Sequence, residues 1–340
     1  MCKTRLRNPC FACVLFAVLI APVRAQDQAQ QLAEIHTLLA ADKNDEAIER
    51  LQALATRYPD MRGISHELGV AHYRKKDFLR AATYLKQATQ ENPGDKDSVQ
   101  LLGLSYYFSG RPAEAITPLE KVRSWHSKSN MDAGYVLGLC YLLTKNNDQA
   151  RRVFSELYDV QSESAAAHLI LASMLVRQGF DPTAEDEAKK ALSLEPRVPL
   201  AHFVLGQVYL YKSRIPEAMT EFQKELVINP RFASAYTRLG EAYSRAGRYD
   251  DAERSLQNSI WLDSTSSEPY VLMGRALLKK GQVEMAERTL LRAVAIDPNS
   301  YEAHHVLGET YRQMGKLNLA QRELKIGADL QQAQTQNAPR

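Results

Sequence analysis

Cysteine is scarce in this chain of 340 residues: there are four, and Cys2, Cys10 and Cys13 all lie near its start. Without that first segment only Cys140 remains, so we expect no intramolecular disulfide even in an oxidising compartment. Cys140 lies in the apolar stretch VLGLCYLL, which favours a buried thiol over a reactive one. Proline and glycine are also few, at 14 and 16 residues, and 45% of residues are hydrophobic, which indicates a folded chain rather than a disordered one.

Catalytic motifs are missing as well. After residue 25 there is no glycine-rich phosphate loop, no G-x-S-x-G, no H-E-x-x-H and no C-x-x-C. The eight histidines show no chelating spacing, since the adjacent His304 and His305 would point about 100° apart on a helix. We therefore expect no catalytic residues, no cofactor, no metal site and no enzymatic activity.

Charge excludes another class of partner. The net charge is +3, but residues 1–25 contain Lys3, Arg5, Arg7 and Arg24 and no acid, so the remainder carries −1. A nearly neutral chain gives no electrostatic reason to expect nucleic-acid binding.

Residues 1–25 have the features of a signal peptide. The basic segment MCKTRLR precedes the apolar run CFACVLFAVLIA and the small-residue site Val23-Arg24-Ala25. The run is too short to span a bilayer comfortably, which takes about 20 residues. We predict an exported protein, periplasmic or secreted, with no membrane span after the signal is removed. The alternative is a chain that stays tethered to the membrane by an uncleaved N-terminal segment.

The rest of the chain repeats with a period of 34 residues. Nine units begin near residues 28, 62, 96, 131, 165, 199, 233, 267 and 301, and only the step into 131 is 35 residues long. Position 20 of the unit is alanine in all nine, position 8 is glycine in seven, and position 24 is leucine or phenylalanine in eight. These units span residues 26–330, and we expect the polar tail 331–340 to be disordered.

Each unit contains two amphipathic patterns separated by a turn, as in FVLGQVYLYK and IPEAMTEFQKELVI. We call the two predicted helices A and B. A mid-helix glycine costs about 1 kcal/mol relative to alanine, so its recurrence at one position predicts a close helix crossing. We expect glycine 8 of helix A to face alanine 20 of helix B.

The pattern L-G-x-x-Y, followed by Ala, Phe or Leu, and Pro on a 34-residue period, resembles the tetratricopeptide repeat. The resemblance covers about residues 28–330 and implies an all-α, right-handed superhelical solenoid of about nine helix-turn-helix repeats. The tryptophan that the family has at position 4 is replaced here by His168, His202, Tyr236, Tyr270 and His304.

In that family a concave groove lined by the A helices binds proteins or peptides. Carried over to this chain, the groove has an apolar and aromatic part and a cationic part. Its predicted residues are Tyr107, Phe108, Tyr135, Leu139, Phe203, Tyr211, Arg245, Arg275, Lys279 and Arg312. The alternative is that the aromatic residues are interhelical core.

The function expected from this resemblance is a non-catalytic protein- or peptide-binding scaffold of the cell envelope or secretory compartment. One alternative is a structural protein that self-associates, with a homodimer formed through Ile326 and Leu330 at the C-terminal end. A further alternative is a non-catalytic subunit of an envelope enzyme complex, or a carbohydrate-binding module.

Overall fold

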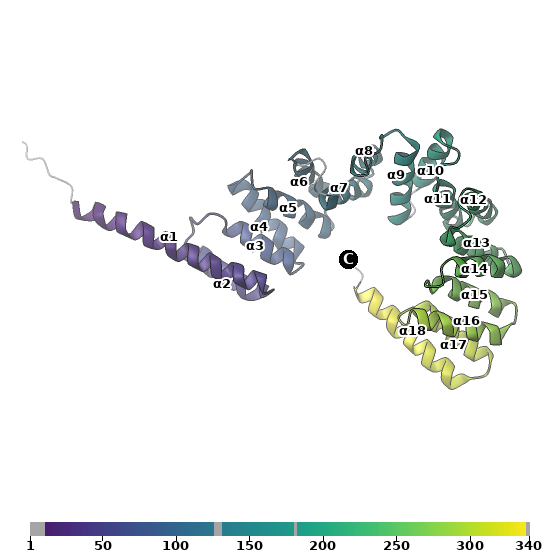
Figure 1. The fold of residues 1–340 in the computed structure, drawn as a ribbon. Helices are drawn as coiled ribbons and strands as arrows, with labels where there is room; N and C mark the ends of the chain where they lie inside the picture. The colour runs from purple at the N-terminus through teal and green to yellow at the C-terminus, as the bar shows by residue number, and fades with distance from the viewer. Residues whose placement is uncertain (1–10, 126–130, 180–181, 338–340) are drawn as a thin grey trace, which may run out of the picture. The chain divides into compact units, whose positions relative to one another are not determined.

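The computed structural model describes residues 11–125, 131–179 and 182–337, with side chains described except at 11–25, 131 and 337. These residues form eighteen α-helices and no strand (Figure 1). The chain divides into two compact units, residues 1–145 and 146–340, and each is described here by itself. Both are helical-repeat solenoids, as the sequence predicts.

The first unit contains the helices of the first three repeats and helix A of the fourth. Helix α1 runs from Phe11 to Ala40 and crosses the predicted cleavage position, and the signal peptide itself remains a prediction. The helices that follow are α2 (Asn44–Arg57), α3 (Ile64–Arg74), α4 (Phe78–Glu91), α5 (Lys96–Phe108), α6 (Pro112–Trp125) and α7 (Met131–Leu143).

The second unit begins with helix B of the fourth repeat. Its helices are α8 (Asn147–Leu157), α9 (Ala165–Arg177), α10 (Thr183–Leu194), α11 (Ala201–Tyr211), α12 (Ile215–Ile228), α13 (Ala233–Arg245), α14 (Tyr249–Leu262), α15 (Glu268–Lys279), α16 (Val283–Ile296), α17 (Tyr301–Gln313) and α18 (Leu317–Asn337). Apart from α1, every A helix begins within two residues of the start predicted for its repeat.

Helices pack mainly on their neighbours along the chain. Within each unit, A helices of successive repeats also contact one another, as α3 does α5 and α11 does α13. Successive B helices have no comparable contact in the part of the chain that the structure describes. The A helices therefore form the closely packed side of each solenoid, and the outer face of the B helices is left open.

The turn between helices A and B has one backbone conformation throughout. Position 15 of every repeat has a positive φ, a left-handed conformation that favours glycine. Glycine occupies this position in five repeats, and the other four place non-glycine residues there, namely Asp42, Lys76, Lys145 and Ser213. The turn that the sequence predicts between the two amphipathic patterns of each repeat is confirmed.

The expected contact between glycine 8 and alanine 20 is not the closest one, although the backbone oxygen of Ala252 would lie 3.4 Å from a Cβ on Gly240. The glycines face the large residue at position 24: a Cβ on Gly206 would lie 2.6 Å from Cε1 of Phe222, and one on Gly274 would lie 2.6 Å from Leu290. Alanine 20 lies one helical turn before position 24 and is buried too, as at Ala218. Glycine is needed because the large side chain at position 24 fills the space that a Cβ would occupy.

The fifth repeat solves the same packing problem differently. It has Ala172 instead of glycine at position 8 and Ala188 instead of leucine or phenylalanine at position 24, and both are completely buried. Compared with most other repeats, the residue at position 8 is larger and the residue at position 24 is smaller, which conserves volume across the A–B contact.

The expected disorder of residues 331–340 is also wrong in part. Helix α18 continues to Asn337, because the segment LQQAQTQ contains good helix formers and no glycine or proline. Residues 338–340 lie outside the described residues. Ile326 and Leu330, the predicted dimer contacts, are half-buried in α18, and dimer formation remains a prediction.

Candidate partner-binding surfaces

The ten predicted groove residues are divided between the two units. Tyr107, Phe108, Tyr135 and Leu139 belong to the first, and the other six belong to the second. We describe each group within its own unit.

In the first unit, side chains of α3, α4 and α5 form what we call the α5 aromatic cluster: Tyr73, Phe78, Tyr107 and Phe108. The ring centroids of Phe78 and Phe108 are 5.0 Å apart and those of Tyr107 and Phe108 are 5.2 Å apart. Tyr73 contacts Phe78 edge-on at 5.5 Å. Such offset and edge-on arrangements are the favourable ones for aromatic pairs.

The α5 aromatic cluster is anchored in the core and open at one end. Burial raises the pKa of Tyr107, and the nearby Cys140 and Tyr135 raise it further, which places Tyr135 of α7 beside the cluster. Phe108, by contrast, is 45% exposed. The cluster therefore presents the exposed edge of Phe108, which packs on the half-buried rings of Phe78 and Tyr107.

Two predicted groove residues belong to the core instead. Leu139 is 5% exposed, so it packs between helices. Phe203 is half-buried and packs on Phe222 at 5.8 Å and on Phe232 at 4.8 Å between ring centroids. Both were misplaced because a position on helix A does not reveal which of its neighbours covers it.

The remaining residues of the second unit are exposed. Tyr211, at the end of α11, is 60% exposed. Arg245 forms an ion pair with Glu241 at 2.8 Å and donates a hydrogen bond to the carbonyl oxygen of Leu210. Its guanidinium is therefore held against the C-terminal end of α11, where a cation is favourable.

The other three cations are arranged loosely. Arg275 lies 3.7 Å from Glu302, and Arg312 is paired with Glu309 three residues earlier on the same helix. Lys279 has no ion pair among the described residues. Exposed pairs of this kind contribute little to stability, so these side chains can exchange partners at small cost.

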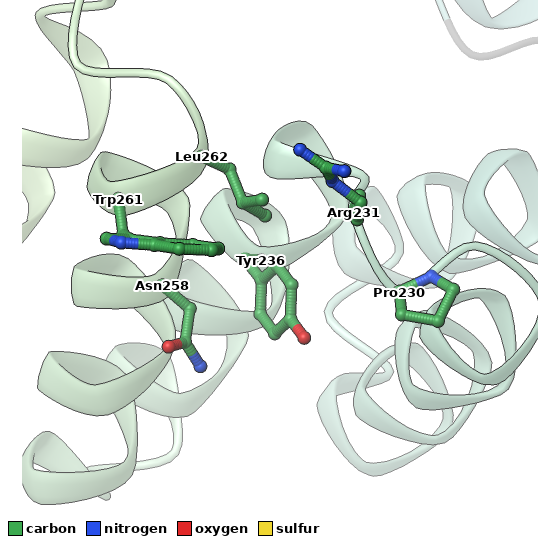
Figure 2. A pocket seen from close by; sticks show the side chains of 6 residues that line it. All are labelled: Pro230, Arg231, Tyr236, Asn258, Trp261 and Leu262. Atoms are coloured by element: carbon green, nitrogen blue, oxygen red, sulfur yellow. The ribbon is translucent and has the colours of Figure 1, made fainter.

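Sequence reasoning missed a third surface, which we call the Trp261 pocket (Figure 2). It has a volume of about 320 Å³ and lies where the loop after α12 meets α13 and α14. Figure 2 shows Trp261 and Asn258 on one side, Pro230 and Arg231 on the other, and Tyr236 between them; Leu262 completes the lining. Trp261 is 78% exposed, the most exposed of the large hydrophobic side chains that the structure describes.

The histidines at position 4 lie between helices A and B, each beside a glutamate of helix B. Nδ1 of His168 lies 2.6 Å from Glu187, Nδ1 of His304 lies 2.6 Å from Glu323, and His202 has the same contact with Glu221. Within the described ranges no group of three or more His, Cys, Asp or Glu residues is placed to hold a metal ion.

Comparison with known families agrees with the repeat geometry. Models of the tetratricopeptide repeat match residues 32–96, 101–159 and 144–199, residues 245–305, and residues 221–254 and 289–322. The chain belongs to the tetratricopeptide-repeat family. Such repeats are typical of protein-interaction scaffolds and are generally not catalytic.

Solved tetratricopeptide-repeat structures share the fold at low identity. A chain of the APC/C hetero-tetramer Cut9-Hcn1 is 18% identical with a TM-score of 0.46, over 82% of this chain and 55% of that one. YrrB, described as a TPR protein with an unusual peptide-binding site, is 23% identical with a TM-score of 0.42, over 50% and 88%. MamA from Desulfovibrio magneticus RS-1 is 21% identical with a TM-score of 0.45, over 50% and 96%.

At these identities and TM-scores the likeness carries no inference about function. No match to the chain was found among curated proteins. In the segments that the structure describes, none of the helices has both the length and the apolar character needed to span a membrane.

Proposed function

We propose that this protein is a non-catalytic scaffold that binds a protein or peptide partner, and that it acts in the cell envelope or after secretion. The observation that carries the proposal is the α5 aromatic cluster. Its rings are fixed by packing, yet Phe108 remains 45% exposed at its edge. Rigid aromatic side chains supply large contact area at little entropic cost, which makes them frequent hot spots of interfaces.

Exposed residues at the same repeat position support the proposal. Position 13, at the end of helix A, is occupied by Phe108, Leu143 and Tyr211, which are 45%, 47% and 60% exposed. In the seventh and eighth repeats the same position holds Arg245 and Lys279. Within the second unit, a partner that contacts the ends of the A helices would meet an apolar contact at Tyr211 and positive charge at Arg245 and Lys279.

Photo-crosslinking tests the surface directly. A photoreactive phenylalanine analogue at Phe108 or at Tyr211 should capture a partner protein in cells. The same analogue at Leu317, which is 62% exposed on α18, is the control for exposure alone. Capture at 108 or at 211 that exceeds capture at 317 is the expected result. Equal capture at all three positions would refute the proposed surface.

A further inference from the structure

The Trp261 pocket uses none of the residues of the proposed function, which lie at position 13 at the ends of the A helices (the A-helix surface). It is lined by the loop after α12, the start of α13 and the end of α14. Position 29, occupied by Trp261, follows the buried Ala252 at position 20 by nine residues, or two and a half turns of an α-helix. Trp261 therefore lies on the side of α14 opposite to Ala252, and it lines the pocket together with Tyr236 of the preceding helix α13. An exposed tryptophan beside a pocket needs an explanation that packing does not supply.

The repeat pattern singles out this part of the molecule. Position 29 is apolar in three consecutive repeats, the sixth to the eighth, with Val227, Trp261 and Ala295. Val227 is 75% exposed and Ala295 is exposed as well. Position 29 is polar in the other six repeats, namely Thr56, Gln90, Ser124, Asp159, Ser193 and Asp329. The three residues hold the same repeat position on successive B helices, α12, α14 and α16, and we call this set the apolar row, with Trp261 as its middle member.

Polar groups around the pocket are left without partners. Among the described residues, the guanidinium of Arg231, the amide of Asn258 and the hydroxyl of Tyr236 make no hydrogen bond or ion pair. All three line the same pocket as the indole of Trp261 (Figure 2). They could therefore offer a ligand two donor groups and an amide beside an aromatic face.

The charge near the row is mixed, because Asp263 and Asp297 accept hydrogen bonds from Thr265 and Asn299 but have no cation partner among the described residues. The carboxylates of α14 form ion pairs: Asp250 and Glu253 pair with Lys280, and Asp251 pairs with Arg248 and Arg254.

On the next B helix, α16, Arg288 and Arg292 are exposed and have no carboxylate partner in the described part of the chain. Arg292 holds the repeat position that Asn258 holds in α14. Only Glu284, in the first turn of α16, is an exposed acid without a cation there. The complementary ligand is thus apolar where it meets the row and carries a carboxylate where it meets Arg231, Arg288 or Arg292.

We propose that the Trp261 pocket and the apolar row bind an extended acidic peptide segment. An apolar side chain of the peptide enters the pocket against Trp261, and a carboxylate beside it pairs with Arg231. A row that crosses three successive helices suits an extended chain better than a single sugar ring, and the free guanidinium favours a carboxylate over a neutral glycan. The volume of about 320 Å³ is at the lower end of the roughly 300–1,000 Å³ of ligand pockets and fits one or two side chains.

The inference rests on the proposed function as a peptide-binding scaffold, but it uses a different surface. The probe is a phage-displayed library of random linear peptides selected on the whole protein. We expect the selected peptides to contain an apolar residue flanked by Asp or Glu. Trp261→Ser should weaken their binding by about thirtyfold, the effect of losing a hot-spot side chain. Arg231→Glu should weaken it by about tenfold at low salt and less at high salt.

The repeat supplies matched controls. Arg197 holds the position of Arg231 one repeat earlier, where the next helix B carries Val227 in place of Trp261, so Arg197→Glu should weaken binding less than Arg231→Glu does. Leu194, 55% exposed at the end of α10, controls for loss of an exposed apolar side chain. Only two tryptophans are present, so Trp125→Phe makes Trp261 the sole indole. Its emission should then shift on addition of a selected peptide.

The outcomes separate the two proposals. Peptides that need Phe108 but not Trp261, an empty selection, or a Trp261 signal that responds to neutral oligosaccharides and not to acidic peptides would each overturn the pocket proposal. Trp261-dependent peptides together with equal crosslinking at 108, 211 and 317 would support the pocket and refute the A-helix surface.

Discussion

At the scale of the single residue, the contact between position 8 and position 24 determines how closely helices A and B approach. Gly206→Ala would place a methyl group 2.6 Å from the ring of Phe222, so the helices must shift. We expect the free energy of unfolding to fall by about 1–3 kcal/mol, as for other overpacked cores. Chemical denaturation measures this loss, and Gly94→Ala is the control, since its Cβ would meet nothing closer than 3.5 Å.

A double-mutant cycle tests the cause of that loss. Phe222→Ala alone leaves a cavity and should cost about 3–5 kcal/mol. Gly206→Ala combined with Phe222→Ala reproduces the Ala172–Ala188 pair of the fifth repeat. The double variant should therefore lose less stability than the sum of the two single variants. Additive losses would show that the two side chains do not compete for the same space.

At the turn position with a positive φ, substitution by glycine should raise the stability of the fold rather than lower it. Ser213 has φ +57° and Gly247 has φ +74° at the same repeat position. A residue with a Cβ pays about 1–2 kcal/mol in this conformation, while glycine pays about 0.5–1 kcal/mol of extra chain entropy. Ser213→Gly should thus raise the melting temperature slightly and Gly247→Ser should lower it. Two changes of the same sign would contradict this explanation.

At the scale of helices, Glu185 links α10 to the turn between α11 and α12. Its carboxylate lies 2.7 Å from Lys189, 2.6 Å from Lys212 and 3.3 Å from Arg214. Burial works against the charged form, but the hydrogen bonds and charges of the two lysines prevail and lower the pKa of Glu185 to about 2. One carboxylate that satisfies three cations holds the fifth and sixth repeats together.

This lowered pKa predicts a pH dependence. A carboxyl group whose folded pKa is depressed stabilises the fold above its unfolded pKa of 4.5 and loses that contribution as the pH falls toward about 2. Glu185→Gln should cost about 3 kcal/mol near neutral pH, at 1.36 kcal/mol per pKa unit. The difference in unfolding free energy between wild type and Glu185→Gln should narrow steadily from about pH 5 to pH 3. Glu284→Gln, which removes an exposed and unpaired carboxylate, should show no such trend.

The helices could be predicted from sequence because small residues recur at fixed positions. Alanine 20 marks the buried face of every helix B, so all nine repeats were found. The partner of glycine 8 could not be predicted, because sequence does not state how two helices are rotated against each other. The coverage of Leu139 and Phe203 by neighbouring helices could not be predicted for the same reason.

The Trp261 pocket was not predicted because the resemblance to the family points to a groove lined by the A helices. Its signal was in the sequence: position 29 is apolar only at Val227, Trp261 and Ala295. What the sequence could not supply is the convergence of Pro230 and Arg231, from the loop of one repeat, with Trp261 of the next.

At the scale of the whole molecule, export remains a prediction that one measurement decides. The basic start, the short apolar run and Val23-Arg24-Ala25 predict cleavage before Gln26. N-terminal sequencing of the protein recovered from cells should begin at Gln26 or within a few residues of it. An intact Met1 on protein recovered from the cytosol would contradict export, and an intact Met1 on membrane-bound protein would support the tethered alternative.

The buried Cys140 reports how far a local disturbance spreads along the solenoid. Its thiol is completely buried, and burial raises its pKa to about 12, so it should resist alkylation until its repeat opens. In the described part of the chain, substantial contacts join helices at most two places apart, so coupling should decay along the array. Gly103→Leu, whose new side chain would clash with Leu119 within the third repeat, next to the repeat that contains Cys140, should accelerate labelling of Cys140.

Gly308→Leu creates the same clash, with Leu324, in the ninth repeat and serves as the matched distant variant. Both substitutions should lower stability near their own site, which hydrogen exchange measures. Only Gly103→Leu should change the alkylation rate of the peptide that contains Cys140, as followed by mass spectrometry. If Gly308→Leu accelerated labelling of Cys140 equally, the protein would unfold as one cooperative body, and the nearest-neighbour description of its stability would be wrong.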